Sequence, residues 1–303
     1  MIRKQGTCAL CGKEAKLELS HIVPKMVIRE LKKTSVGQLR SSKNPNGTVQ
    51  DSEKCYMLCG ECEDLFSKYE TNFSKFMFHP YLRGEEDTFT YDEKLFYFVT
   101  SVSWRSLYQD LLDYVQNNVV GIDALECLIS SEQIMRDFLL GRRSDIGEIE
   151  NHIYFFSQVI KMEGWENKIG IQEVRPNESI FRSETSYTVC YESVGTYVTF
   201  TNMMGIILLT FYRKRPEEQL LGTRIFNGEG TIYAKNQRMI STVGNELTRQ
   251  MMQLKNMSEN MSEEQKQKIN ERIRKSGKNF FDSNAYKNKV ADQNIEFDSG
   301  SRR

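Results

Sequence analysis

Three short segments near the N-terminus decide the fold of this chain: Cys8-Ala9-Leu10-Cys11, Ser20-His21-Ile22-Val23-Pro24 and Cys59-Gly60-Glu61-Cys62. Two residues between paired cysteines let both sulfurs turn toward one ion at about 2.3 Å. Two such pairs supply the four thiolates of a closed tetrahedral Zn²⁺ site. The sequence therefore predicts structural zinc on Cys8, Cys11, Cys59 and Cys62, with His21 beside the metal but outside its ligand shell. The same spacing is also typical of a zinc ribbon that only binds.

Composition places the chain among ordinary soluble proteins. It has 303 residues, enough for about two domains, with 39% hydrophobic and 27% charged residues and a formal net charge of zero. Residues 25–43 differ, because they carry six basic side chains against Glu30 alone, a local net charge of +5. We expect this basic stretch to bind the phosphates of a nucleic acid, although a solvated loop is the alternative interpretation. The six residues are Lys25, Arg29, Lys32, Lys33, Arg40 and Lys43.

The remaining cysteines and the apolar segments indicate the compartment. Cys55, Cys127 and Cys190 have no paired spacing, and the chain opens on polar residues without the apolar segment of a signal peptide. We therefore expect a reducing, cytoplasmic location, which favours a bound metal over disulfides. The longest apolar run, Met203 to Tyr212, is far shorter than the ~20 residues that span a bilayer. It is interpreted as a buried strand, and no membrane partner is expected.

Residues 1–84 have the pattern of a small zinc-braced module. A strand is predicted at residues 15–20, a second one near residues 55–58, and a helix from about residue 60. The helix is predicted because large apolar side chains recur at spacings of three and four, namely Leu65, Phe66, Tyr69, Phe73 and Phe76. Between the strands, residues 41–47 have the composition of a turn.

The rest of the chain predicts an α+β companion domain over residues 85–276, with a role in docking, sensing or oligomerisation. Helical periodicity covers two helices within residues 91–140 and returns at about 237–255 and 262–275. Strand candidates between them are residues 153–162, 186–192, 196–201, 206–213 and 223–234. Residues 277–303 read as a polar C-terminal tail, either mobile or ordered against a partner. The predicted fold class is α+β, a zinc-braced module followed by a helical segment and a β-rich domain with C-terminal helices.

The chain resembles the HNH (His-Me finger, ββα-metal) endonuclease family in the order of its elements. These are a Cys-x-x-Cys pair, a strand ending in His-Ile-Val-Pro, a loop, a short strand, a second Cys-x-x-Cys pair and a helix. The resemblance is to the zinc-containing Cys₄ form and covers about residues 8–75. It implies two strands and a helix around one catalytic divalent ion, Mg²⁺ or Mn²⁺, with a separate structural zinc. It also implies that His21 is the catalytic histidine. Imidazole suits that role independently, because its ordinary pKa of about 6.5 leaves it partly deprotonated at neutral pH.

Three positions depart from the pattern of that family. Ser20 stands where an acidic metal ligand is usual, and Lys54-Cys55 stand where an asparagine is expected. Glu63 stands at the helix position usually held by a histidine ligand. We expect Glu63 to hold the catalytic ion, because a carboxylate oxygen suits Mg²⁺. The alternative is that Glu63 only complements the positive end of the helix.

From these residues we expect a metal-dependent HNH-type endonuclease that hydrolyses phosphodiester bonds, with DNA favoured over RNA. The alternative is a non-catalytic zinc-ribbon subunit that binds nucleic acid or protein through a degenerate HNH site. Modules of this layout recur as effectors of bacterial anti-phage (antiviral) defence, and by analogy a protein partner or a homo-oligomer is expected. The Trp104-Arg105 pair lies in an aromatic helix pattern and is interpreted as core, with stacking on a base as the alternative.

Overall fold

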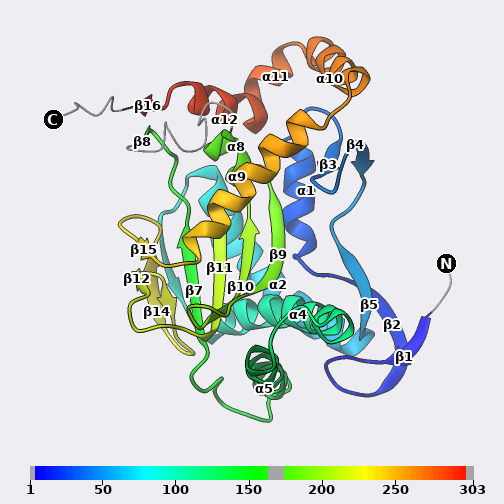
Figure 1. Ribbon diagram of the computed structural model, residues 1–303, viewed down its shortest axis with the longest axis vertical. Helices are drawn as coiled ribbons and strands as arrows, with labels where there is room; N and C mark the ends of the chain where they lie inside the picture. Colours follow the sequence, from blue (N-terminus) through cyan, green and yellow to red (C-terminus); the bar gives the residue numbers. More distant parts are fainter. Residues whose placement is uncertain (1–3, 163–173, 298–303) are drawn as a thin grey trace.

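A computed structural model describes residues 4–162 and 174–297 of the chain and shows a mixed α/β protein (Figure 1). The N-terminal sheet has the strand order β1-β2-β5 and is antiparallel throughout. Its strands are β1 (Lys4–Thr7), β2 (Glu14–His21) and β5 (Lys54–Cys59), and α2 (Gly60–Phe73) follows β5 without a break. The predicted strands and the predicted start of the helix are confirmed here, with one extra strand before them.

Between β2 and β5 the chain forms a helix and a hairpin. Helix α1 (Lys25–Lys33) begins after Pro24, whose fixed φ suits the residue before the first helical turn, and it buries Val27, Ile28 and Leu31. The strands β3 (Leu39–Ser41) and β4 (Asn44–Val49) then pair antiparallel. The predicted turn residues thus lie in and around the tip of a short hairpin.

Helix α4 (Glu93–Asn117) is the central element of the molecule. Asp92 caps it, accepting a hydrogen bond of 3.0 Å from the backbone N–H of Lys94. Its residues from Leu95 to Leu107 are buried except for Tyr97, because α4 packs against α2, against α5 (Ile122–Leu139) and against the large sheet. Before it lie η1 (Ser74–Phe78), α3 (His79–Arg83) and β6 (Thr88–Tyr91). A single hydrophobic cluster therefore joins the N-terminal sheet to α4 and α5.

The large sheet is antiparallel and has the strand order β13-β7-β11-β10-β9. Its strands are β7 (Glu150–Phe155), β9 (Glu184–Tyr191), β10 (Thr196–Met203), β11 (Ile206–Arg213) and β13 (Arg224–Ile225). Successive side chains of a strand point to opposite faces. In β11, Ile206 and Leu208 join the cluster around α4, whereas Ile207 and Leu209 join a second cluster with Met251 of α9 (Gly244–Glu259). The sheet is thus covered on both faces (Figure 1).

Several strands and helices begin or end at residues other than those predicted. The strand predicted at residues 223–234 divides into β13 and β14 (Gly230–Tyr233), and β15 (Arg238–Ile240) occupies the start of the helix predicted from residue 237. The structure also contains β8 (Lys161–Met162), α8 (Pro176–Phe181), β12 (Gln219–Leu221) and α10 (Glu263–Ser276).

The segment predicted as a polar tail has regular structure in its described part. It forms α11 (Lys278–Asp282), α12 (Asn284–Gln293) and β16 (Glu296–Phe297), which pairs in parallel with β8. Neither of these two helices contains a buried residue. Within residues 4–162 and 174–297, every helix is too short or too polar to cross a membrane.

Candidate functional site

The four paired cysteines meet in one cluster. Cys8 and Cys11 come from the turn between β1 and β2, Cys59 ends β5, and Cys62 lies in the first turn of α2. Their sulfur atoms all lie within 4.8 Å of one another, and the Cys11 and Cys59 Sγ atoms are 3.8 Å apart. A tetrahedral zinc with bonds of about 2.3 Å would separate its sulfurs by about 3.8 Å. The cluster therefore fits a metal ion such as zinc.

The electrostatics of this cluster also suit a bound cation. Burial acts to raise the pKa of Cys8, but backbone hydrogen bonds outweigh it and the pKa of this thiol lies below its ordinary value. Burial and the neighbouring sulfurs raise the pKa of Cys62 well above its ordinary range. The thiolate of Cys8 is therefore favoured and that of Cys62 is opposed, and four thiolates held together require a cation.

Ser20 and Glu63 meet directly beside the cysteine cluster. Ser20, the residue before the last in β2, is fully buried, and its Oγ donates a hydrogen bond of 2.7 Å to Oε2 of Glu63 in α2. Asp64, the next residue, is exposed. The structure thus brings together one end of β2 and the first turn of α2, with a single half-buried carboxylate between them.

His21 has a partner that the sequence did not predict. Its Nε2 lies 3.1 Å from Oδ1 of Asp51, and Lys54 Nζ lies 2.9 Å from the other oxygen of that carboxylate. Burial alone would raise the pKa of Asp51, but the hydrogen bonds from Lys54 and His21 outweigh it and hold this pKa well below its usual range. Asp51 therefore stays ionised at neutral pH and fixes the orientation of the imidazole.

Arg105 reaches this site from α4. Its side chain is 1% exposed, its Nη1 donates to the backbone oxygen of His21 at 2.9 Å, and its Nη2 donates to Glu70 at 2.7 Å. The neighbouring Trp104 is fully buried, and its ring N–H donates to Glu132 at 2.8 Å. The core interpretation of the Trp104-Arg105 pair is therefore confirmed, and stacking on a base is excluded.

The basic residues divide into exposed and engaged side chains. Lys25, Arg29, Lys33 and Lys43 are exposed. Arg40 is engaged, because its guanidinium donates to the backbone oxygen of Pro45 at 2.9 Å and to Gln265 at 3.1 Å. Lys32 is exposed but donates to the backbone oxygen of Gln50. Lys25, Arg29 and Lys43 are thus open to a phosphate. Lys33 lies 3.9 Å from Glu30 of the same helix, and Arg40 has a structural role in the hairpin.

No second ligand cluster is assembled. In the part of the chain that the structure describes, the four cysteines are the only group of three or more His, Cys, Asp or Glu side chains with close ligand atoms. His21, Asp51 and Glu63 do not form such a group. Mg²⁺ often takes only one or two protein carboxylates and completes its shell with water and substrate phosphate. Glu63 can supply one such carboxylate, but it does not belong to a cluster of several ligands.

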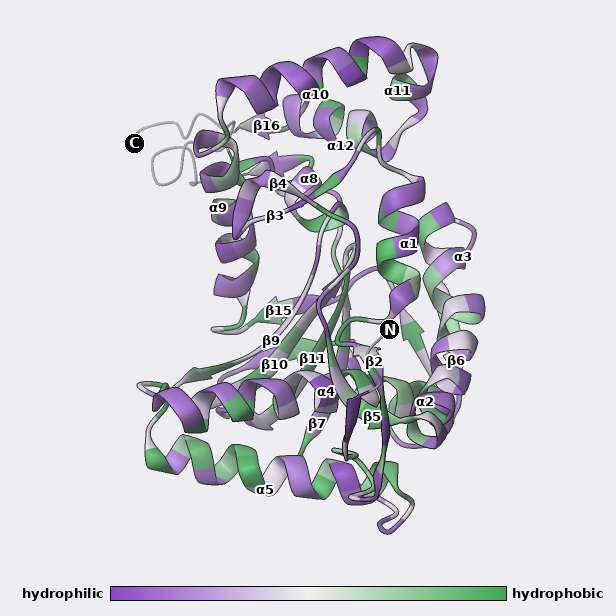
Figure 2. Ribbon diagram, turned by 90° about the vertical axis from the view of Figure 1, so that its right-hand side faces the viewer, coloured by the Kyte–Doolittle hydropathy of each residue, from purple (hydrophilic) through white to green (hydrophobic). Residues whose placement is uncertain are grey.

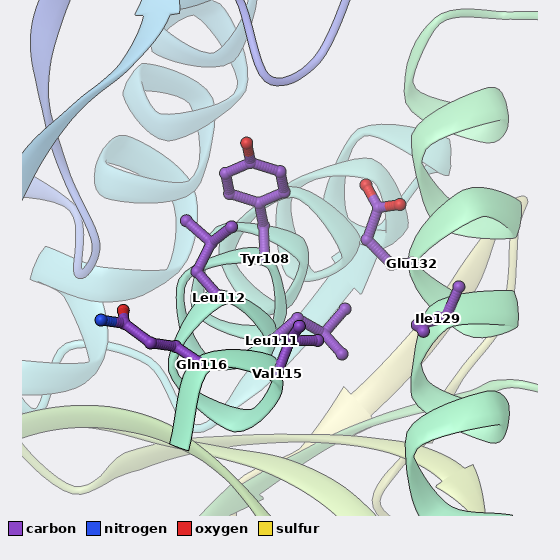
Figure 3. Close-up of a pocket in the computed structure, with 7 residues that line it drawn as sticks. All are labelled: Tyr108, Leu111, Leu112, Val115, Gln116, Ile129 and Glu132. Carbon is purple, nitrogen blue, oxygen red and sulfur yellow. The ribbon is translucent and has the colours of Figure 1, made fainter. Parts of the chain in front are cut away.

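A cavity between α4 and α5 lies outside this site. It has a volume of about 280 Å³ and is lined by Leu112, among others; Figure 3 shows Leu111 and Val115 of α4 on the side of Ile129 and Glu132 of α5. The remaining lining residues are Tyr108 and Gln116. Because Glu132 is engaged by Trp104, this mostly apolar cavity presents no reactive pair of groups.

Comparison of the chain with family models, with curated proteins and with solved structures found no match.

Proposed function

We propose that this protein is a metal-dependent endonuclease of the HNH type that hydrolyses phosphodiester bonds in DNA. Support comes from the order of two antiparallel strands and a helix, with His21 at the end of β2 and Glu63 in the first turn of α2. The cysteine cluster braces the same strands and helix, and in this proposal it holds structural zinc. The observation that carries the proposal is the contact between His21 and the ionised Asp51.

In this proposal His21 is the base that activates water. Because Asp51 accepts at Nε2, the imidazole carries its proton there and leaves the lone pair of Nδ1 for a water molecule. Nδ1 makes no hydrogen bond within the described residues, so it is open to that role. Arg105 holds the backbone of His21 and thereby keeps the ring at the end of β2.

Glu63 is the carboxylate that would hold the catalytic ion. When bound, Mg²⁺ or Mn²⁺ would neutralise the charge that develops on the leaving oxygen. Ser20 orients the Glu63 carboxylate through its hydrogen bond. The exposed residues Lys25 and Arg29 of α1, just after His21, would bind neighbouring phosphates without reading the base sequence.

A plasmid-cleavage assay tests the proposal. The purified protein should nick or linearise plasmid with Mg²⁺ or Mn²⁺, and His21→Ala should reduce the rate by roughly 10²–10⁴-fold, the usual contribution of a general base. Glu63→Ala should also reduce cleavage and raise the metal concentration that is needed. The matched control is His79→Ala, which removes a histidine from α3 and should leave cleavage unchanged. Equal cleavage by the wild type and His21→Ala would overturn the mechanism.

A second function is favoured by one specific observation. Ser20 occupies a position where a carboxylate would help to hold a divalent ion, and it forms a hydrogen bond with the single carboxylate that is present. This arrangement is what a non-catalytic zinc module that binds nucleic acid or protein would retain. Under this alternative the protein binds duplex DNA but cleaves none with either metal, and His21→Ala leaves the binding unchanged.

A further inference from the structure

A second positively charged segment lies on the C-terminal helices. Residues 266–278, in α10 and at the start of α11, carry six basic side chains against Glu271 alone, a net charge of +5 that equals that of residues 25–43. Lys266 and Lys268 form ion pairs with acidic residues of the same helix. The other four, Arg272, Arg274, Lys275 and Lys278, are exposed and form no ion pair within the described residues.

Helix α10 is attached to the hairpin of the N-terminal module. Arg40 donates to Gln265 at 3.1 Å, Arg272 donates to Gln38 at 3.2 Å, and the backbone N–H of Ser262 donates to Asn46 at 2.9 Å. In Figure 1, α10 and α11 lie beyond the end of α1, next to β3 and β4. The two positively charged segments, more than 200 residues apart in sequence, therefore adjoin in space.

The two segments form one bent path that starts at His21, because α10 runs across the end of α1 and does not continue its axis (Figures 1 and 2). Helix α1 begins four residues after His21 and is about 14 Å long, and α10 is about 21 Å long, at 1.5 Å per residue. A duplex advances about 3.4 Å per base pair, so the far end of α1, where α10 lies, is roughly four base pairs from its start. Some exposed basic side chains of the two segments form neither an ion pair nor a side-chain hydrogen bond to a backbone oxygen within the described residues. They define what we call the α1–α10 surface: Lys25, Arg29, Lys43, Arg272, Arg274, Lys275 and Lys278.

We propose that the α1–α10 surface binds the phosphate backbone of one nucleic-acid duplex, with α10 contacting phosphates several base pairs away from the one at His21. This inference rests on the proposed function, to which it adds a role for the C-terminal helices. A phosphate backbone is the partner that fits, because the side chains are basic and exposed and lie on elements that adjoin in space. An anionic membrane would instead favour an exposed apolar face beside the charges. Helix α10 is largely hydrophilic (Figure 2), and Ile269 and Ile273 are partly covered.

The test compares two double charge reversals in full-length protein that carries His21→Ala, so that DNA is bound without being cut. Arg274→Glu with Lys275→Glu changes α10. Lys75→Glu with Arg238→Glu changes the net charge equally at exposed residues of η1 and β15, which also lack ion pairs in the described structure. Binding is measured by fluorescence anisotropy on duplexes of about 24 and about 8 base pairs at several salt concentrations. Circular dichroism and thermal melting check that each variant is folded.

On the long duplex, the α10 variant should bind at least roughly tenfold more weakly than its parent, and its salt dependence should fall by about 2 in log–log slope, because two phosphate contacts are lost. The control variant should stay within about twofold of the parent. On the short duplex, about 27 Å long, the difference between the two variants should be smaller, because this duplex covers fewer of the phosphate contacts. Equal binding and equal salt slopes of both variants on the long duplex would overturn the inference, as would an undiminished effect on the short one.

Two further outcomes separate this inference from the proposed function. If the α10 variant loses duplex binding while His21-containing protein cuts no plasmid, the surface is real and the nuclease proposal fails. If cleavage depends on His21 while the α10 variant binds DNA normally, the nuclease proposal stands and this inference fails. Vesicles with phosphatidylserine are the last probe, and binding to them but not to duplex would assign the surface to a membrane and overturn the inference.

Discussion

The contact between His21 and Asp51 shows why a site residue can escape detection in a sequence. Thirty residues separate the two side chains, and no spacing rule joins them. The strand register joins them, because His21 pairs with Lys54 across β2 and β5, which places the chain just before β5 beside the imidazole. The paired cysteines were predictable since each pair lies within one turn of the chain, whereas the position of Asp51 depends on a hairpin and a helix inserted between the strands.

Replacing Asp51 with asparagine should affect both activity and stability. We expect cleavage to fall by roughly 10–100-fold, since a partner that orients a functional histidine has lost its charge. We also expect a loss of about 1–2 kcal/mol in the free energy of unfolding at pH 7. The pKa of Asp51 is lowered in the folded protein, so its ionised form stabilises the fold above the ordinary carboxyl pKa of about 3.9. That stabilisation is lost as the pH falls through the lower pKa of the folded state.

Urea denaturation at pH 7 and near pH 3 measures this difference, and it should shrink at the lower pH. Asp64→Asn is the control, because it removes an exposed carboxylate from α2 in the same module without removing a described contact. A difference between Asp51→Asn and the wild type that is equal at both pH values would contradict the assignment.

Among the helices and strands, the sequence predicted best those whose formation depends on residues that are close together in the chain. Strand β11 has the predicted bounds, because a run of apolar and β-branched residues follows Gly205, whose φ of 92° suits the turn from β10. The start of α2 was predicted from its apolar spacing. The helix predicted from residue 237 begins at Gly244 instead, since residues 238–240 pair with β12. That pairing is a tertiary contact, and it overrides the local helical pattern.

The attachment of α4 to α2 gives a prediction about Arg105. Arg105→Ala would leave Glu70 without its cation and the backbone oxygen of His21 without a donor, in a region where the arginine is 1% exposed. We expect a loss of about 3 kcal/mol in the free energy of unfolding, as for other buried pairs with one partner removed. Arg105→Lys should lose less, because a single ammonium reaches one of the two partners.

Urea denaturation of Arg105→Ala, Glu70→Gln and the double variant measures the coupling between the two side chains. The double variant should be less destabilised than the sum of the single variants, because each single change leaves the other partner alone. Additive losses would show that Arg105 and Glu70 act independently.

For the molecule as a whole, one hydrophobic cluster joins the four clustered cysteines, α2, α4 and one face of the large sheet. Phe73 of α2 stacks on Phe98 of α4 with ring centroids 4.0 Å apart, and Phe66 packs edge-on against Trp104. The N-terminal sheet, α2, α4 and α5 therefore bury their apolar side chains in the same cluster. The sequence could suggest a module boundary from composition, but it could not show that the two parts share a core.

We therefore expect metal release and global unfolding to coincide. On heating, zinc release followed with a chromogenic chelator and tertiary structure followed by near-ultraviolet circular dichroism should show one common midpoint, because the cluster of cysteines belongs to the shared core. Cys62→Ser should lower both the zinc content, to well below about one per chain, and that midpoint. Cys55→Ser is the control, since this half-buried thiol lies outside the cluster and should change neither. A separate, earlier transition for zinc release would instead show that the N-terminal sheet and α2 unfold independently of α4, and residues 1–84 would then fold alone.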